Sequence, residues 1–313
     1  MEAHHGGFLF TGSCNLKFDK PAITFDQQID LLIKRGMVVS DRDYAHHYLA
    51  HLNYYRLGAY WLPFEADHTS HTFKPNTNFN DVVSLYVFDR ELRLLIMDAI
   101  ERLEVSIRTQ WAHQLAHSYG SHAYLNSAIF KSKGLHDDNL AKLKKELGRS
   151  KEVFISHYKR NYSEPSLPPI WAVVEVMTLG QLSKWVSGLA RGQDRQSIAR
   201  NYGIDELLLT SFLHHLSIVR NLCAHHSRLW NRRFSFQFKM PRHPEELHVS
   251  LNPDQKKQLY NTLVILEYMM NIISPDHHWK KRLISLFDKH PIANSNAMGF
   301  PVDWKSRPVW QEK

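Results

Sequence analysis

The 313-residue sequence lacks the marks of several familiar classes of protein. It has two cysteines, Cys14 and Cys223, which are too few for a disulfide framework and favour a reducing cytoplasm. Its longest apolar runs are far shorter than the roughly 20 residues that a membrane helix needs. The apolar patch Phe8-Leu9-Phe10 has neither a basic lead-in nor a small-residue cleavage site, so we expect no secretory signal.

The composition is instead that of a folded, basic protein. Hydrophobic residues make up 43% of the chain and charged residues 22%, which is enough apolar surface for a sizeable core and too little charge for disorder. The formal net charge of +8 favours anionic partners, with nucleic acid first and acidic membrane second. The sequence contains no internal repeat, and nothing in it forces a domain boundary.

The pattern of apolar residues is mostly helical. The longest helix is expected between residues 81 and 117, where apolar side chains recur at spacings of three and four without glycine or proline. Asn80 or Asp81 is its expected cap, and Gly180 is the expected interruption of a later helix. Alternating phenylalanines at 234, 236 and 238 suggest one short extended segment. The expected helices cover residues 23–35, 41–52, 81–117, 136–147, 171–189, 205–224 and 253–273.

The segment Arg220-Asn221-Leu222-Cys223-Ala224-His225 combines side chains suited to cleaving RNA without a metal. Arginine is a permanent cation, and histidine titrates near neutrality. Cleavage needs a base that removes the 2′-hydroxyl proton and a cation that stabilises the pentavalent phosphorus centre. Asn221 can exchange hydrogen bonds with the phosphate oxygens. The expected products are a 2′,3′-cyclic phosphate and a 5′-hydroxyl.

Helix geometry restricts how this motif can work. At about 100° per residue, Asn221 and His225 share a face, whereas Arg220 and His225 are about 140° apart. A straight helix would not direct both Arg220 and His225 at one phosphate. The helix must therefore end or distort inside the motif, or a second copy of the chain must supply part of the site.

The stretch around the motif, IVRNLCAHHSRLWNR (218–232), closely resembles the signature of bacterial abortive-infection proteins of the AbiD/AbiF type. Those proteins belong to the HEPN superfamily, whose shared mark is an arginine, four to six residues and a histidine. Three further stretches agree in order: LNYYRLGAYWLPF (52–64), FDRELR (88–93) continuing to Glu101, Glu104 and Arg108, and MGFP (298–301) with Trp304 and Trp310. The resemblance runs from about residue 20 to the end.

This resemblance implies a single all-α domain over residues 1–313. Helices of an N-terminal extension would occupy about 20–80, the HEPN-like helical bundle 81–235, and a C-terminal helix with an irregular tail 236–313. It also implies a cytoplasmic protein that defends against phage by cutting or binding RNA, with no cofactor, metal or membrane. Some relatives are inhibited by a small non-coding RNA encoded beside them, a toxin–antitoxin arrangement. Because this chain has one motif, a homodimer is expected.

The predicted site has three parts. Arg220, Asn221 and His225 are the expected catalytic residues, supported by Glu101, Glu104, Arg108 and His226. RNA-binding roles are expected for Arg228, Arg232, Arg233, Tyr55 and Arg56. Arginines form ion pairs with phosphates, and exposed aromatic rings stack against bases.

Simpler interpretations remain open for several of these residues. Glu104 and Arg108 could be an ordinary i,i+4 ion pair, and the aromatic cluster around Tyr55 is more often a core. His113 and His117 have zinc-compatible spacing without a third ligand nearby. The protein as a whole could be a ribonuclease, a non-catalytic module that grips a regulatory RNA, or a helical scaffold without a nucleic-acid role. The intact Arg–Asn–His set favours the ribonuclease over the RNA-binding module, and the basic charge with the flanking arginines favours both over the scaffold.

Overall fold

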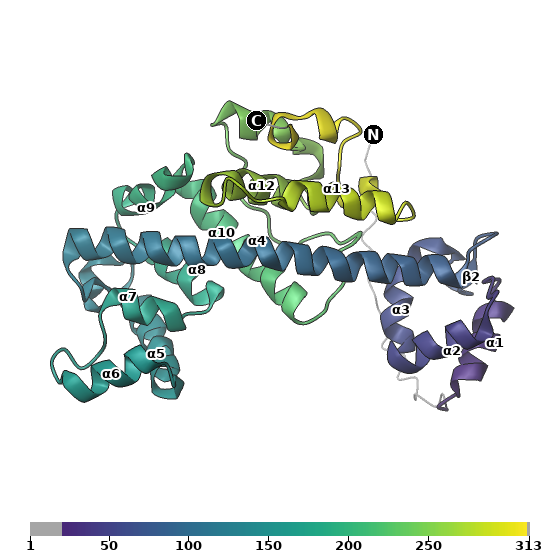
Figure 1. The fold of residues 1–313 in the computed structure, drawn as a ribbon, viewed down its shortest axis with the longest axis horizontal. Helices are drawn as coiled ribbons and strands as arrows, with labels where there is room; N and C mark the ends of the chain where they lie inside the picture. Colours follow the sequence, from purple (N-terminus) through teal and green to yellow (C-terminus); the bar gives the residue numbers. More distant parts are fainter. Residues whose placement is uncertain (1–20, 312–313) are drawn as a thin grey trace, which may run out of the picture. The chain divides into compact units, whose positions relative to one another are not determined.

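The computed structural model describes residues 21–311. Phe8-Leu9-Phe10 and Cys14 therefore lie outside the described residues. The chain divides into two compact units, Met1–Val82 and Val83–Lys313. Thirteen α-helices and one two-stranded sheet make up the described part, so the predicted all-α class is confirmed (Figure 1).

The first unit contains three short helices followed by a small hairpin. Thr24 caps α1 through a capping box with Gln27, and Asp41 caps α2 by accepting a hydrogen bond from the Tyr44 N–H, as polar residues at these positions predict. The elements are α1 (Phe25–Lys34), α2 (Arg42–His51), α3 (Tyr54–Trp61), the 3₁₀ turn η1 (Leu62–Phe64), β1 (Glu65–Asp67) and β2 (Thr72–Phe73).

The aromatic residues of α3 divide between core and surface. Tyr60 and Trp61 are buried, and the Trp61 ring meets the Phe73 ring edge-on. Tyr54 is half-buried and accepts a 2.9 Å hydrogen bond from Arg35. Tyr55 is 82% exposed. The core interpretation therefore holds for most of the cluster but not for Tyr55.

The long central helix is confirmed as α4 (Phe79–Tyr119). It begins earlier than expected because Asn78, rather than Asn80 or Asp81, takes the capping position: its side-chain oxygen accepts the Asn80 N–H at 2.9 Å. The apolar stripe that predicted the helix is its buried face, since Leu92, Ile96 and Leu103 are all inaccessible to solvent.

Shorter helices surround α4 in the second unit. The Tyr202 hydroxyl bonds Ser106 at 2.8 Å, and the Trp279 indole N–H donates to the Leu95 carbonyl at 2.7 Å, so elements far apart in sequence attach to the same helix. The α-helices are α5 (Lys133–Arg149), α6 (Val153–Asn161), α7 (Ile170–Val173), α8 (Leu179–Gly188), α9 (Gly192–Ala199), α10 (Glu206–Ala224), α11 (Glu245–Ser250), α12 (Tyr260–Ile273) and α13 (Trp279–Lys289). The 3₁₀ turns are η2 (Ala123–Leu125), η3 (Ser127–Ile129), η4 (Val174–Val176), η5 (Arg200–Tyr202), η6 (Pro253–Gln255), η7 (Ser295–Met298), η8 (Trp304–Ser306) and η9 (Pro308–Trp310).

Two of the predicted helices were wrong in detail. The helix expected over 171–189 breaks at Met177–Thr178 rather than at Gly180, because Thr178 forms a capping box with Gln181 and starts α8. The helix expected to open at Pro253 starts only at Tyr260, after the turn η6. Five helices were not predicted at all: α3, α6, α9, α11 and α13. The phenylalanines at 234–238 lie in a segment that is neither helix nor strand and bends at Ser235, so the short extended segment stays a prediction.

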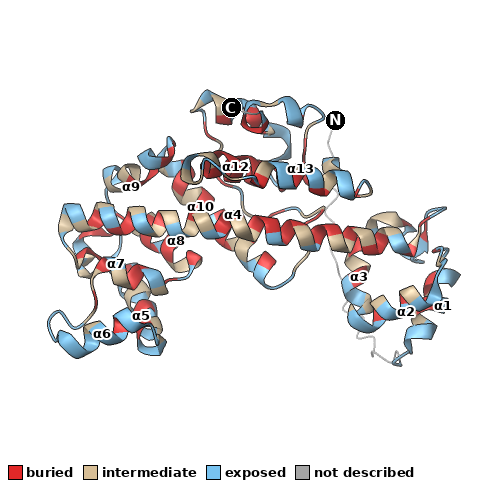
Figure 2. Ribbon diagram, viewed as in Figure 1, coloured by how far each residue is buried: buried red, intermediate tan, exposed pale blue. Residues whose placement is uncertain are grey.

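Two helices form the apolar centre of the second unit. Every residue of α12 from Tyr260 to Met270 is buried (Figure 2). α10 packs against α8, and nine of its residues are buried. By length and composition alone α10 could cross a membrane, and it is the one such helix in the described part, but 44% of the window that passes this test is already buried inside the protein.

Candidate functional site

The end of α10 falls inside the predicted motif. Asp205 caps its start, and the helix ends at Ala224 with His225 as C-cap. The Ser227 N–H donates to the Leu222 carbonyl at 2.8 Å and the His226 N–H to the Cys223 carbonyl at 3.0 Å. This pair of bonds is a Schellman motif, whose left-handed position is filled here by His226 with φ 56°. The requirement that the helix ends inside the motif is met.

Arg220, still on α10, lines a pocket of about 580 Å³ against α4. Glu101, Glu104 and Arg108 line the same pocket, so the arginine of the motif and all three predicted supporting residues of α4 do lie together. Leu94 and Val105 are also in the lining and are 60% and 51% exposed. The pocket therefore has a charged interior and apolar side chains that remain accessible.

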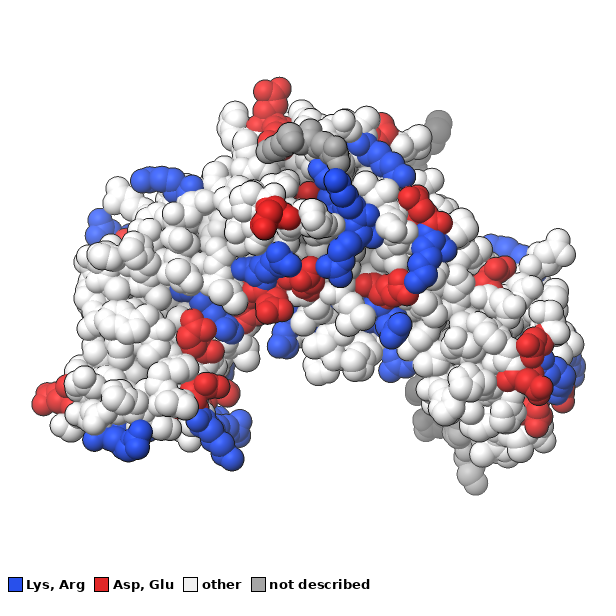
Figure 3. Space-filling view, viewed as in Figure 1, with Lys and Arg blue, Asp and Glu red and all other residues white. Residues whose placement is uncertain are grey.

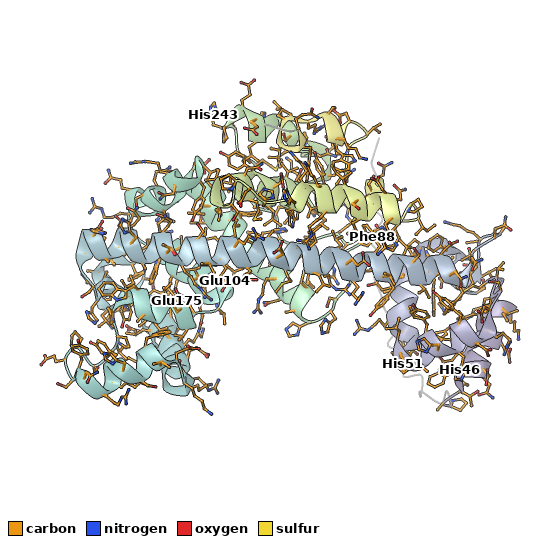
Figure 4. The ribbon with its side chains drawn as sticks, viewed as in Figure 1. His46, His51, Phe88, Glu104, Glu175 and His243 are labelled. Atoms are coloured by element: carbon orange, nitrogen blue, oxygen red, sulfur yellow. The ribbon has the colours of Figure 1, made fainter. Side chains whose placement is uncertain are left out.

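Arg108 connects this pocket to the segment after α7. It donates to Glu104 at 2.5 Å and to the Met177 carbonyl at 2.6 Å, and lies 3.6 Å from the carboxylate of Glu175. Glu104 and Glu175 are labelled in Figure 4. Burial raises the pKa of Glu104, while the nearby guanidinium groups of Arg108 and Arg220 act in the opposite direction. Glu104 thus interacts with Arg220 electrostatically, in addition to its i,i+4 pair with Arg108.

A buried aspartate fixes the chain beyond the motif. Asp89 of α4 is inaccessible to solvent and accepts the N–H of Leu229 at 3.0 Å and that of Trp230 at 2.6 Å. It also forms a buried ion pair with Arg93, whose guanidinium lies 3.5 Å from the Ser227 carbonyl. The loop that follows α10 is thereby attached to α4 over several consecutive residues.

The other two residues of the predicted catalytic set lie outside the pocket lining. Asn221 and His225 are both exposed. The Arg220 guanidinium is 3.5 Å from the Asn221 side-chain oxygen. No contact that we observe between described residues joins Arg220 to His225. Within a single chain, Arg220, Glu104 and Arg108 therefore lie together, whereas the His225 side chain is exposed at the end of α10.

The predicted RNA-binding residues fall into two groups. Arg228 and Arg232 are half-buried in the loop after α10, where the Arg232 Nε donates to the Arg228 carbonyl at 2.7 Å, and Arg233 is exposed. Tyr55 and Arg56 belong to the first unit and are exposed on α3. All five predicted RNA-binding side chains are thus at least partly accessible.

The surface charge around α4 and α13 is mixed. On the face seen in Figure 3, basic and acidic side chains alternate over these helices instead of forming one basic patch. Asp98 in the pocket lining, for example, accepts from Arg282 at 3.1 Å. Between residues 21 and 311 no group of three or more His, Cys, Asp or Glu side chains is arranged to hold a metal. Cys223 is buried, and burial raises the pKa of its thiol to about 12.

The sequence did not reveal the role of Asp89 and Arg93. Both are charged residues that share the helix face of Phe88 and Leu92, which are buried. An acid and a base four residues apart within an apolar stripe are the signal that could have identified a buried ion pair, because lone buried charges are costly.

Comparison with known proteins places the chain in one family. No curated protein and no solved structure matches the sequence significantly. A family model described as Abi-like protein matches residues 47–231, a range that includes α3, the pocket on α4, the whole of α10 and the loop held by Asp89. The chain therefore belongs to the family of Abi-like proteins, whose name refers to abortive infection, a defence against phage.

Proposed function

We propose that this protein is a metal-independent endoribonuclease of the HEPN type that acts in abortive infection from the cytoplasm. Family membership supports the defence role. The observation that carries the enzymatic part is the placement of the motif: Arg220 lines a pocket with Glu104 and Arg108, and α10 ends just before an exposed His225. A permanent cation and a titratable imidazole are thus available at one helix end.

In the proposed reaction the RNA supplies its own nucleophile. His225 accepts the proton of a 2′-hydroxyl, whose oxygen attacks the adjacent phosphorus while the P–O5′ bond breaks. Arg220 stabilises the negative charge on the non-bridging oxygens, and Asn221 orients the phosphate. Glu104 holds the Arg220 guanidinium in position by its charge, and Arg108 fixes the Glu104 side chain through their ion pair. The leaving 5′-oxygen takes a proton from water, and the protonated His225 returns its proton to the resulting hydroxide, which leaves a 2′,3′-cyclic phosphate and a 5′-hydroxyl.

The separation of Arg220 from His225 within one chain is the reason to propose a homodimer. Within one chain Arg220 lines the pocket and His225 does not, so a single copy offers an incomplete site. A two-fold dimer with both motifs near its axis would bring the partner subunit's His225 to Arg220. Leu94 and Val105, exposed and apolar at the pocket, are suitable contacts for such an interface.

A matched set of variants tests the ribonuclease. We expect the wild-type protein to cleave host or phage RNA in the presence of EDTA and to leave cyclic phosphate ends. His225→Ala should lower the single-turnover cleavage rate by roughly 10²–10⁴-fold, as loss of a general acid–base group does, while retaining RNA affinity and the thermal unfolding midpoint. Cleavage that EDTA abolishes and added Mg²⁺ restores would contradict the metal-free mechanism.

One observation favours a second candidate function, a non-catalytic module that binds a small regulatory RNA. The Arg220 pocket exists in a single chain without His225 in its lining. On this alternative the wild type binds RNA with a salt-sensitive affinity and cleaves none, and Arg220→Ala weakens binding whereas His225→Ala does not. Tight binding without any cleavage would therefore shift the assignment to the RNA-binding module.

A further inference from the structure

One tryptophan departs from the pattern of the other seven. The sequence has eight tryptophans, and seven of them are buried in the structure, with exposed fractions of 6% or less. Trp171, at the start of α7, is 56% exposed. A large aromatic ring is usually buried because it carries much apolar surface, so an exposed one next to a pocket requires an explanation.

Trp171 lines a pocket of about 310 Å³ between α7 and the C-terminal part of α4, which we call the tryptophan pocket. Ala112, Ala116 and Val174 form apolar parts of its wall. His113 and His117 also line it, and their ring centroids are 4.3 Å apart. Ligand pockets usually measure roughly 300–1,000 Å³, so this one suits a single flat heterocycle. The carboxylate of Glu175 also lines it.

The segment that carries Trp171 is held at both ends. On its N-terminal side, the Ile170 N–H donates to the Ser121 carbonyl at 2.8 Å and the Tyr124 hydroxyl to the Pro168 carbonyl at 2.7 Å. On its C-terminal side, Arg108 donates to the Met177 carbonyl at 2.6 Å. The exposed ring is therefore displayed by a fixed backbone, which lowers the entropy cost of binding a ligand.

The tryptophan pocket continues the pocket of the proposed nuclease site along α4. Val105 and Arg108 line the Arg220 pocket, and Thr109 and Ala112, one turn further along, line the tryptophan pocket. Glu175 bridges them, since it lines the second pocket and lies 3.6 Å from Arg108 of the first. A ligand that occupies both would need a phosphate for Arg220 and an aromatic ring for Trp171.

Resting on the proposed RNA function, we propose that the tryptophan pocket binds one unpaired nucleobase of the RNA whose phosphate lies at Arg220. The base stacks on Trp171, as bases do on aromatic platforms of proteins that bind single strands. Glu175 is a hydrogen-bond acceptor only, so it pairs best with the exocyclic amino group of adenine, cytosine or guanine, whereas uracil offers only its N3–H between two carbonyl oxygens that repel the carboxylate. The pocket thus gives the enzyme a preference for single-stranded RNA with an amino-bearing base at this position.

The experiment measures RNA affinity in a His225→Ala background, in which the RNA stays intact. The probes are single-stranded oligo(A), oligo(C) and oligo(U) of about ten nucleotides, a length typical of one binding site. Trp171→Ala should weaken oligo(A) and oligo(C) binding about ten-fold or more, the usual effect of losing one stacked base. Trp171→Phe should restore most of the affinity. Tyr162→Ala is the matched control, because Tyr162 is also aromatic and also 56% exposed, and it should have no effect.

Each other outcome overturns a defined part of the proposal. If Trp171→Ala leaves RNA affinity unchanged, the proposed base pocket is wrong, whereas the proposed nuclease is not affected. If neither the His225→Ala protein nor the wild type binds RNA, both the base pocket and the proposed nuclease are wrong. Loss of dimer in Trp171→Ala by sedimentation, with affinity per dimer unchanged, would make the pocket a protein contact. Glu175→Gln should bring the affinities for oligo(A) and oligo(C) towards that for oligo(U), and unchanged discrimination removes the role of Glu175.

Discussion

The segment from Arg220 to Trp230 has two ends with opposite surroundings. At one end Arg220 lines an open pocket and the His225 side chain is exposed. At the other end Leu229 and Trp230 are buried, and their N–H groups donate to the inaccessible carboxylate of Asp89. The buried end fixes where the segment lies on α4, and the open end keeps charged side chains available to a ligand. Burial and accessibility are thus divided between different residues of one short stretch.

The largest expected effect comes from breaking the buried end. Asp89→Asn leaves Arg93 without its buried counter-charge, and loss of one partner of such a pair costs about 3–5 kcal/mol. We expect urea unfolding to report a decrease of this size. Asp98→Asn is the control, because its ion pair with Arg282 is partly exposed and should contribute at most about 1 kcal/mol. Equal effects of the two substitutions would contradict the anchoring role of Asp89.

Acid should lower the free energy of unfolding by about 3 kcal/mol through His215, a buried residue of α10. Burial lowers the pKa of His215 from its ordinary 6.5 to about 4. Between these values the unfolded chain binds a proton that the folded chain does not, so stability is full above pH 6.5 and is lost as the pH falls to 4, at about 1.4 kcal/mol per unit.

Glu267 has the opposite effect in an overlapping range, which is why a variant is needed. Burial raises its pKa to about 7, so its contribution falls as the pH rises towards 7. The difference in unfolding free energy between wild type and His215→Gln gives the contribution of His215 alone, because Glu267 is the same in both proteins. This difference should change by about 3 kcal/mol between pH 7 and pH 4. A difference that does not vary with pH would show that His215 is not held neutral.

A smaller effect, on activity alone, is expected at the open end. Glu104→Gln removes the charge that interacts with Arg220 and Arg108. Hydrogen bonds to charged groups contribute roughly 1.5–3 kcal/mol, so we expect the cleavage rate to fall by about ten-fold or somewhat more. The pH–rate profile should also change shape, because a carboxyl with a raised pKa no longer titrates in the site. Glu101→Gln, which alters an exposed carboxylate of the same pocket that contributes least to the shifted pKa of Glu104, should change both far less.

The smallest effect is expected at the junction of the two ends. His226 holds the left-handed position of the Schellman motif with φ 56°, a conformation that costs a side-chain-bearing residue roughly 1 kcal/mol. His226→Gly should therefore raise the unfolding free energy by up to about 1 kcal/mol. Cleavage should fall far less than in His225→Ala. A loss as large as that of His225→Ala would move His226 into the catalytic set.

Local signals predicted most of the helices and their starts. The spacing of apolar residues identified α4, and polar caps such as Thr24 and Asp41 marked α1 and α2. The misplaced boundaries arise where two signals competed. Gly180 was taken as a break, but Thr178 can satisfy the free N–H groups of a new helix and so defines the start of α8. α13 went unpredicted although its apolar and basic residues alternate at helical spacing.

The site was predictable in part, for a physical reason. The spacing of Glu101, Glu104 and Arg108 places them on one face of α4, and that face does meet Arg220. The attachment of the loop to Asp89 depends on backbone N–H groups about 140 positions along the chain, which no local pattern records. The tryptophan pocket likewise depends on which turn of α4 lies beside α7. The spacing of residues predicts which side chains share a helix face. Contacts between segments distant in sequence can be identified only from the folded structure.

The most direct test of the central claim mixes two inactive variants. Arg220→Ala and His225→Ala should each fail to cleave RNA in EDTA. After subunit exchange, the heterodimer would contain one site with both substitutions and one with neither, so an equimolar mixture should recover about a quarter of the wild-type rate. Mass spectrometry of the intact assembly confirms that heterodimers have formed. Recovery of cleavage is the predicted result, and an inactive mixture that contains heterodimers would contradict a site composed of Arg220 from one subunit and His225 from the other.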